Sequence, residues 1–265
     1  MNFEEVSIGF LGFGNMGQAI AQGWLSSGKV APKQLYASAR DQEKLKRNTK
    51  ELGMQAVATN EALIEEADIV ILAVKPYQME ELIAPLREKL REKIVISVAV
   101  NLLFADFEEL LSPESQHLSI LPNTPVAFGD GIVLFEEAHS LTDGNFQVIQ
   151  GLFETISHVE VVPSDRMPIA GIVSGSAPAF VDLFTEALAD AAVKHGLNRE
   201  TSYQLVSQMV RGTANLQLNT KKHPGVLKDE IASPAGTTIK GISSLEKDAF
   251  RGSIIQAVDA ILKEN

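Results

Sequence analysis

The sequence predicts an α/β fold made of a parallel sheet over residues 1–162, followed by an all-helical domain over residues 163–265. Three observations support this: apolar stretches alternate with helical patterns in the first part, a glycine-rich turn follows the first apolar stretch, and only helical patterns remain after Pro163. Apolar strands separated by helices are typical of parallel sheets covered on both faces. A chain of 265 residues has room for two such domains.

The elements of the first part follow in chain order. Strands are expected at Val6 to Leu11, Gln34 to Ala37, Met54 to Val57, Ile69 to Val74, Lys93 to Ala99 and Leu118 to Leu121. Helices are expected at Asn15 to Ser27, Asp41 to Leu52, Asn60 to Glu65, Glu80 to Leu90 and Phe104 to Leu111. The region between Leu121 and Val162 is expected to be a less regular tail.

The second part is expected to contain helices only, at Asp165 to Val173, Ala177 to His195, Arg199 to Asn219, Gly225 to Ile231 and Leu245 to Leu262. Alanines recur in the second of these helices, at Ala187, Ala189, Ala191 and Ala192. Small residues let helices approach closely, so this helix is suited to packing within the domain or between subunits.

Composition argues against several classes of partner. Lys and Arg number 23 against 34 Asp and Glu, giving a net charge of −11, so a nucleic-acid partner is not expected. No apolar run approaches the roughly 20 residues that span a bilayer, so no membrane span is expected. The chain has no cysteine, and its five histidines lack metal spacing, so we expect no metal and a cytoplasmic protein.

The first apolar stretch runs into a GxGxxG motif with its glycines at 12, 14 and 17, where a strand turns into a helix. The first glycine permits a tight turn, the second lets the backbone approach a pyrophosphate, and the third lets helix and strand pack closely. This predicts a Rossmann-like dinucleotide site at Leu11, Gly12, Phe13, Gly14, Asn15, Met16 and Gly17. The alternative is a tight turn without a ligand.

The end of the second strand bears on the choice of cofactor. NAD-binding chains usually carry an acid there to accept the ribose 2′-hydroxyl, but Tyr36 to Arg40 contains none. Ser38 and Arg40 are instead suited to a 2′-phosphate through a hydrogen bond and a positive charge. The sequence thus favours NADPH, with NADH as the less favoured alternative and a solvated Arg40 as the competing interpretation.

Two further segments close strands at the edge where ligands of open α/β sheets bind. Lys75 and Pro76 end the fourth strand, and Asn123 lies between two prolines after a later strand. Taken alone, Lys75 is better explained as an ordinary lysine at a strand end, and Asn123 is equally part of a rigid turn.

Five motifs in order resemble the pyrroline-5-carboxylate reductase family: GFGNMG, AVKP, LPNTP, VSGSAPAF and the long HPGVLKDEIASPAGTTIKGISSLE of His223 to Glu246. The last is the most specific. The resemblance implies reduction of 1-pyrroline-5-carboxylate to L-proline, the last step of proline biosynthesis, with hydride from NAD(P)H. It also implies a Rossmann-like domain joined to a helical domain through which subunits form homodimers, often assembled further into decamers.

The resemblance also assigns site residues. It places the substrate carboxylate in the SPAGTT loop at Ser233, Gly236, Thr237 and Thr238, with Thr238 as the catalytic contact to the ring nitrogen, and it places the cofactor against Asn60, Ala73, Val74, Lys75, Pro76 and Asn123. The physical interpretation of the loop agrees, because small residues at a helix start let backbone N–H groups meet an anion. A protonated imine accepts hydride without a general base, so no His or acid pair is required.

The chain departs from the usual family pattern at Asn101, Ala177, Phe180, Lys221 and Ala235. Ala235 costs little unless its φ is positive, whereas Asn101 tolerates a left-handed backbone. One alternative is an NADP-linked dehydrogenase of the β-hydroxyacid type, which is expected to carry a lysine on a helix of the second domain. The other is a reductase-like protein with an altered substrate or a cofactor-binding, non-catalytic role.

Overall fold

The computed structural model describes residues 6–264 and divides into two compact units, Met1–Gly175 and Ser176–Asn265. The first helical turns after Pro163 belong to the first unit, because Met167 packs with Leu134 and Val162 in a small core cluster. The change of secondary structure expected after residue 162 and the division between compact units therefore fall at different places.

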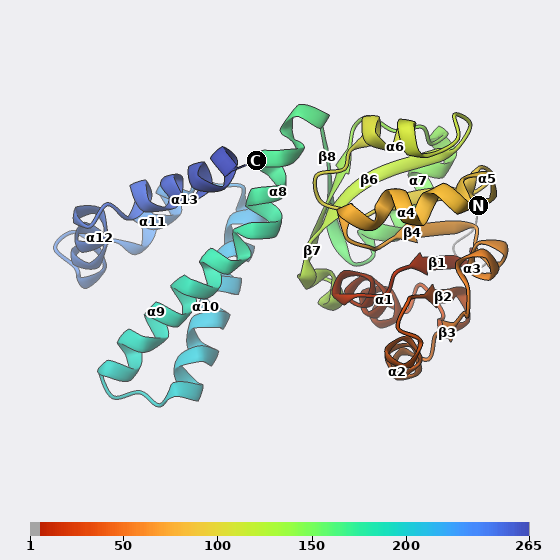
Figure 1. The fold of residues 1–265 in the computed structure, drawn as a ribbon. Helices are drawn as coiled ribbons and strands as arrows, with labels where there is room; N and C mark the ends of the chain where they lie inside the picture. The colour runs from red at the N-terminus through yellow and green to blue at the C-terminus, as the bar shows by residue number, and fades with distance from the viewer. Residues whose placement is uncertain (1–5, 265) are drawn as a thin grey trace. The chain divides into compact units, whose positions relative to one another are not determined.

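The first unit is built on an eight-stranded sheet, within the part of the chain that the structure describes, in the order β3-β2-β1-β4-β5-β6-β7-β8 (Figure 1). Its strands are β1 (Ile8–Leu11), β2 (Leu35–Ser38), β3 (Gln55–Ala56), β4 (Ile69–Leu72), β5 (Ile94–Ser97), β6 (Gln116–Pro122), β7 (Gly131–Glu136) and β8 (Ser157–Val162). Neighbouring strands are parallel except β6 and β7, which pair antiparallel. The order steps outward in both directions from β1, as in a Rossmann-like domain.

Helices of the first unit are α1 (Asn15–Ser27), α2 (Gln42–Leu52), α3 (Asn60–Glu66), α4 (Met79–Ile83), α5 (Arg87–Leu90), α6 (Phe104–Leu110), α7 (Asp143–Glu154) and α8 (Met167–Gly171). Three of them begin with side-chain caps, since Asp41, Thr59 and Thr142 each accept a hydrogen bond from a first-turn N–H. By contrast, α1 begins at Gly14 without a side-chain cap.

Two hydrophobic clusters cover the two faces of the sheet. Alternate strand residues divide between them, with Phe10 in one and Leu11 in the other. The first cluster also holds α1 and α7, where Trp24 is fully buried against Phe153 and donates its indole N–H to the carbonyl of Leu152 at 3.1 Å. The second cluster holds α3, α4, α5 and α6.

Several sequence expectations need correction. The region after β6 is not an irregular tail, because it forms β7, α7 and β8 before residue 163. The helix expected at Glu80 to Leu90 is interrupted by a 3-10 turn at Ala84–Leu86, where Pro85 cannot donate a helical hydrogen bond. The helix expected at Leu245 to Leu262 is two helices, separated at Ala249, whose φ is 55°.

The second unit consists of α9 (Pro178–Lys194), α10 (Arg199–Thr220), α11 (Pro224–Ile231), α12 (Thr237–Lys247) and α13 (Phe250–Glu264). The pair α9 and α10 lies side by side and antiparallel (Figure 1). Asn198 caps α10 by accepting from the N–H of Thr201 at 2.8 Å, and Arg199 pairs with Asp190 of α9 at 2.6 Å.

The second unit buries few apolar side chains. Within its described residues only Ala189, Val206 and Leu227 are buried hydrophobics. Many large apolar side chains are exposed instead, including Val181, Leu183, Phe184, Leu188, Leu205, Met209, Leu216, Leu218, Val226, Ile231, Leu245, Phe250, Ile254, Ile255 and Leu262. Exposed apolar faces of this extent are typical of an interaction surface.

One helical stretch, Ser164–Lys194, meets the length and composition of a membrane span, with a mean hydropathy of 1.4 over its most apolar window. The sequence argument that no apolar run is long enough therefore does not hold by length and composition. A helix that buries its apolar face against another subunit has the same composition, and this stretch includes α9, whose exposed side chains are described above.

Candidate cofactor and substrate sites

The turn from β1 to α1 requires glycine at residue 12. Gly12 has a φ of 88°, and a Cβ there would lie 2.7 Å from Cγ1 of Val74 and 2.8 Å from the carbonyl oxygen of Ala73. Its N–H donates to the carbonyl of Ser38 at 2.9 Å. These contacts join the ends of β1, β2 and β4 at one edge of the sheet.

The next glycine leaves room beside the helix start. Gly14 is exposed, and a Cβ there would have no atom within 4 Å. Because α1 lacks a side-chain cap, its first-turn N–H groups have no side-chain acceptor. An open backbone and uncapped N–H groups at a helix start fit the pyrophosphate of a dinucleotide.

The remaining residues of this loop divide by burial. Leu11, Phe13 and Gly17 are buried, and a Cβ on Gly17 would lie 3.5 Å from Cδ1 of Phe10 in β1, which reflects close packing of helix on strand. Asn15 is exposed and Met16 is half-buried. Leu11 and Phe13 therefore offer a cofactor their main chain only, whereas Asn15 and Met16 also present side chains.

The residues expected at the adenosine end are brought together in part. Ser38 is buried, and its hydroxyl donates to Oδ1 of Asn60 at 2.9 Å, so β2 and the start of α3 present one polar pair. Arg40 is exposed and pairs with Glu81 of α4 at 3.0 Å. Glu81 was not singled out from the sequence because it lies far from Arg40 along the chain, and no local pattern marks the pair.

The segment after β4 continues this edge. Ala73 donates its N–H to the carbonyl of Leu11 at 2.9 Å, and Val74 packs against Gly12. Lys75 and Pro76 are exposed, and Pro76 begins a 3-10 turn at a position where its missing N–H is harmless. Ala73 and Val74 thus shape the wall of the loop, and Lys75 is free to meet a ligand from solvent.

Asn123 has a structural role that the sequence did not reveal. It is buried, its amide nitrogen donates to the carbonyl of Ser174 at 3.0 Å, and its amide oxygen accepts from the N–H of Ile132 at 2.9 Å. Both ends of its amide therefore bind main chain. Its contact with a cofactor stays a prediction. The amide nitrogen has a second hydrogen, and this hydrogen is the group that such a contact would use.

The SPAGTT loop of the second unit turns directly into α12. Gly236 is the N-cap without a side-chain bond, and a Cβ there would lie 2.4 Å from Oγ of Ser233. Thr237 and Thr238 begin the first turn of the helix, and both residues are exposed. An uncapped start of an 11-residue helix, reached by a glycine, suits a small carboxylate.

Comparison with known proteins identifies the family. Residues 164–265 match the family model described as pyrroline-5-carboxylate reductase dimerisation, and residues 7–101 match the one described as NADP oxidoreductase coenzyme F420-dependent. A pyrroline-5-carboxylate reductase of Treponema pallidum (strain Nichols) is 38% identical over 264 residues, covering 98% of this chain and 100% of the relative. The chain belongs to the pyrroline-5-carboxylate reductase family.

Two further members agree over nearly the whole chain. The pyrroline-5-carboxylate reductase of Arabidopsis thaliana is 34% identical, covering 99% of this chain and 95% of the relative. The crystal structure of the Plasmodium falciparum pyrroline carboxylate reductase with NADP bound superposes with a TM-score of 0.88 at 29% identity, covering 98% of this chain and 97% of that one. The family resemblance and the fold class expected from the sequence are confirmed.

Three of the five departures from the family pattern have a left-handed backbone. Ala235, Asn101 and Lys221 all have positive φ, at 59°, 63° and 54°. Asn101 is a residue that tolerates this region, whereas Ala235 is strained where glycine would be relaxed. Lys221 is the C-cap of α10, so its left-handed backbone ends that helix.

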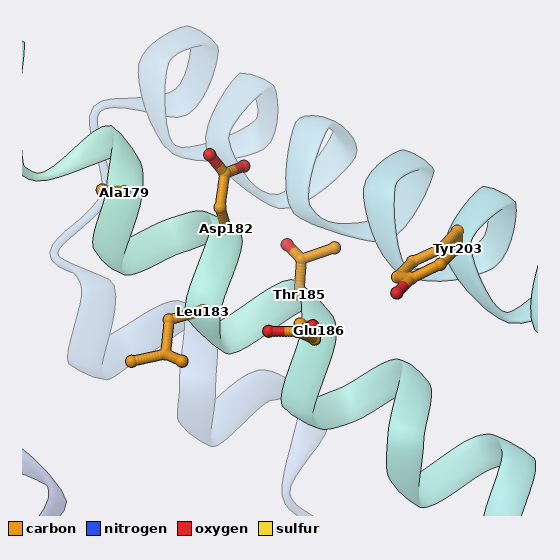
Figure 2. A pocket seen from close by; sticks show the side chains of 6 residues that line it. All are labelled: Ala179, Asp182, Leu183, Thr185, Glu186 and Tyr203. Carbon is orange, nitrogen blue, oxygen red and sulfur yellow. The ribbon is translucent and has the colours of Figure 1, made fainter.

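A shallow hollow of 570 Å³ lies between α9 and α10, with side chains of Asp182, Thr185 and Glu186 from α9 and Tyr203 from α10 at its wall (Figure 2). A β-hydroxyacid dehydrogenase would be expected to place a lysine on such a helix, but the one lysine of α9 is Lys194 in its last turn. The side chains at the hollow therefore give no support to that alternative.

One charge pair outside these loops joins the last two helices of the second unit. Arg251, at the start of α13, donates a hydrogen bond from its Nε to Oε1 of Glu246, near the end of α12, at 2.6 Å, and this bond raises the pKa of Arg251. This pair ties the two helices together beside the break at Ala249. Within residues 6–264, no group of three His, Cys, Asp or Glu side chains is placed to hold a metal ion.

Proposed function

We propose that this protein reduces 1-pyrroline-5-carboxylate to L-proline with hydride from NADPH. The observation that carries the proposal is the pair of uncapped helix starts, each reached by a glycine, within a chain 38% identical to a pyrroline-5-carboxylate reductase over its full length. One suits the pyrophosphate of the cofactor, and the other suits the carboxylate of the substrate. The activity itself follows the family to which the chain belongs.

The residues of the chain bind and orient. In this proposal the first-turn N–H groups of α1 hold the pyrophosphate, and those of Thr237 and Thr238 hold the substrate carboxylate. When bound, NADPH would supply hydride to the carbon of the protonated imine, and the product would be a secondary amine. The hydroxyl of Thr238 accepts a hydrogen bond from that nitrogen and keeps its proton in place.

We assign NADPH as the preferred cofactor over NADH. The end of β2 offers Ser38 and Arg40 and no carboxylate to accept a ribose 2′-hydroxyl, and Asn60 adds an amide beside Ser38. The Plasmodium falciparum relative was crystallised with NADP bound, which supports the same choice. Ser233 and the AVKP segment complete the proposed contacts, as does the remaining amide hydrogen of Asn123.

We further propose that the helical domain, taken from residue 163, forms a homodimer, with a decamer as a further assembly. The exposed apolar faces of the second unit and its small core support this, because an apolar surface of this extent is typical of a subunit interface. The match of residues 164–265 to a dimerisation domain supports the same conclusion. A cytoplasmic location without nucleic-acid partners remains our expectation from the net charge of −11 and the lack of cysteine. We also expect no membrane partner, because the exposed apolar side chains of Ser164–Lys194 fit a subunit interface.

The test is a reductase assay with purified protein, NADPH and pyrroline-5-carboxylate, repeated with NADH and followed by absorbance, with proline measured in the product. Oxidation of NADPH that depends on the imine and yields proline supports the proposal, and the two rates rank the cofactors. Binding of NADPH without imine-dependent oxidation would contradict it and would favour an altered substrate or a non-catalytic role. The strained Ala235 would then be the first residue to revert to glycine.

A further inference from the structure

Arg40, the side chain proposed to bind the 2′-phosphate, forms an ion pair in the structure. Arg40 follows β2, and its Nη2 lies 3.0 Å from Oε2 of Glu81 on α4. The two side chains are 70% and 75% exposed, so both are within reach of a ligand arriving from solvent.

The acid that follows Arg40 in the sequence makes a different hydrogen bond. Asp41 caps α2, and its carboxylate accepts from the N–H of Lys44 at 2.9 Å. Of the two acids in the first turn of α4, Glu80 and Glu81, the second is the one that reaches the guanidinium. Glu81 is therefore the acid that a 2′-phosphate would meet at Arg40.

We propose that Glu81 is a specificity-determining residue that lowers the preference for NADPH by competing for Arg40. This inference rests on the proposed role of Arg40 as reader of the 2′-phosphate. A phosphate that binds the guanidinium must displace the carboxylate from it, so binding of NADPH gives up the 3.0 Å ion pair. NADH carries a hydroxyl at that position, so it leaves the ion pair intact.

The size of the effect follows from the exposure of the pair. Exposed ion pairs contribute little, which corresponds to a change of about twofold to fivefold in a dissociation constant. Glu81→Gln keeps the size of the side chain and an oxygen for Arg40 but removes the charge. We expect this variant to bind NADPH and NADP more tightly by that factor, while the dissociation constant of NADH changes less than twofold.

The experiment is a calorimetric titration of the full-length protein with NADPH and NADH at low and high salt, and it requires no turnover. The matched control is Glu80→Gln, which removes the same charge from the same turn and is expected to shift the NADPH to NADH ratio less. The reference variant is Arg40→Gln, which should weaken NADPH selectively. In Arg40→Gln/Glu81→Gln the second substitution should give no further gain, because Glu81 acts through Arg40.

The possible results test the role of Glu81 separately from the proposed role of Arg40. If Arg40→Gln weakens NADPH selectively but Glu81→Gln equals Glu80→Gln, the role of Glu81 is wrong and that of Arg40 stands. If Glu81→Gln weakens NADPH, the carboxylate positions Arg40 for the phosphate, and competition is refuted. A gain that persists without Arg40 would also overturn the mechanism. If Arg40→Gln leaves NADPH binding unchanged, both assignments fail, and the reductase assay still judges the activity independently.

Discussion

Gly14→Ala is expected to weaken cofactor binding while it leaves the stability of the first unit almost unchanged. A Cβ at residue 14 has no atom within 4 Å, and the φ of −82° is open to alanine. Losing a glycine stabilises by about 0.4–1 kcal/mol through the unfolded chain, whereas alanine is a poorer N-cap by a similar amount. These effects offset, so the first unit should unfold within about 2 °C of the wild type.

Cofactor binding should respond very differently. The methyl group would occupy the open space through which a pyrophosphate approaches the N–H groups of α1, and a hydrogen bond to a charged group contributes about 1.5–3 kcal/mol. We therefore expect NADPH to bind roughly 10- to 100-fold more weakly. Calorimetric titration with NADPH and a thermal scan of the ligand-free protein measure the two effects separately.

Gly12→Ala is the contrasting variant. Its φ of 88° costs an L-residue about 1–2 kcal/mol, and the contacts of 2.7 Å and 2.8 Å add a packing cost of about 1–3 kcal/mol. The first unit should then unfold at least about 4 °C lower. Wild-type NADPH affinity in Gly14→Ala would refute the reasoning, because it would mean that the pyrophosphate does not approach the backbone at Gly14.

Three further predictions concern the second unit. Thr238→Ala should keep NADPH affinity and lose most turnover, measured by titration and by proline formation; unchanged turnover would show that its hydroxyl does not serve the imine nitrogen. Ala235→Gly should relax the positive φ and stabilise the unit by about 0.5–1 kcal/mol, measured as a higher urea midpoint at fixed protein concentration, and an equal or lower midpoint would argue against strain at this turn. Leu183→Glu, on a side chain that is 66% exposed, should dissociate the dimer in light scattering, whereas Val161→Glu in β8 of the first unit should not; a dimeric Leu183→Glu would place the interface elsewhere.

The sequence predicted the elements whose signals are local. The expected bounds of α1 match the observed ones because the glycine loop marks its start, and in the structure Gly28, at a φ of 68°, ends it. The strand β8 was missed because most of its side chains lie at the surface, so it shows no apolar run. The antiparallel pairing of β6 with β7 was also missed, since register and direction depend on contacts that no single segment records.

The candidate sites likewise contain parts that the sequence predicts and parts that it does not. The loops at Gly12 and Gly236 were predicted because the absence of a side chain is visible in the sequence, and the structure shows what a Cβ would meet there. The bond between Ser38 and Asn60, the pair of Arg40 with Glu81 and the bonds of the Asn123 amide were not predicted. Each joins segments that are distant along the chain, so only the tertiary structure reveals them.

The placement of Trp24 has a practical consequence for studying the two units. It is the single tryptophan of the chain, it is fully buried, and it lies on the helix that begins at the glycine loop. Its intrinsic fluorescence therefore reports on the first unit alone, and loss of its buried environment marks the unfolding of that unit without a label. A denaturation profile that differs between fluorescence and helical circular dichroism would show the two units melting separately.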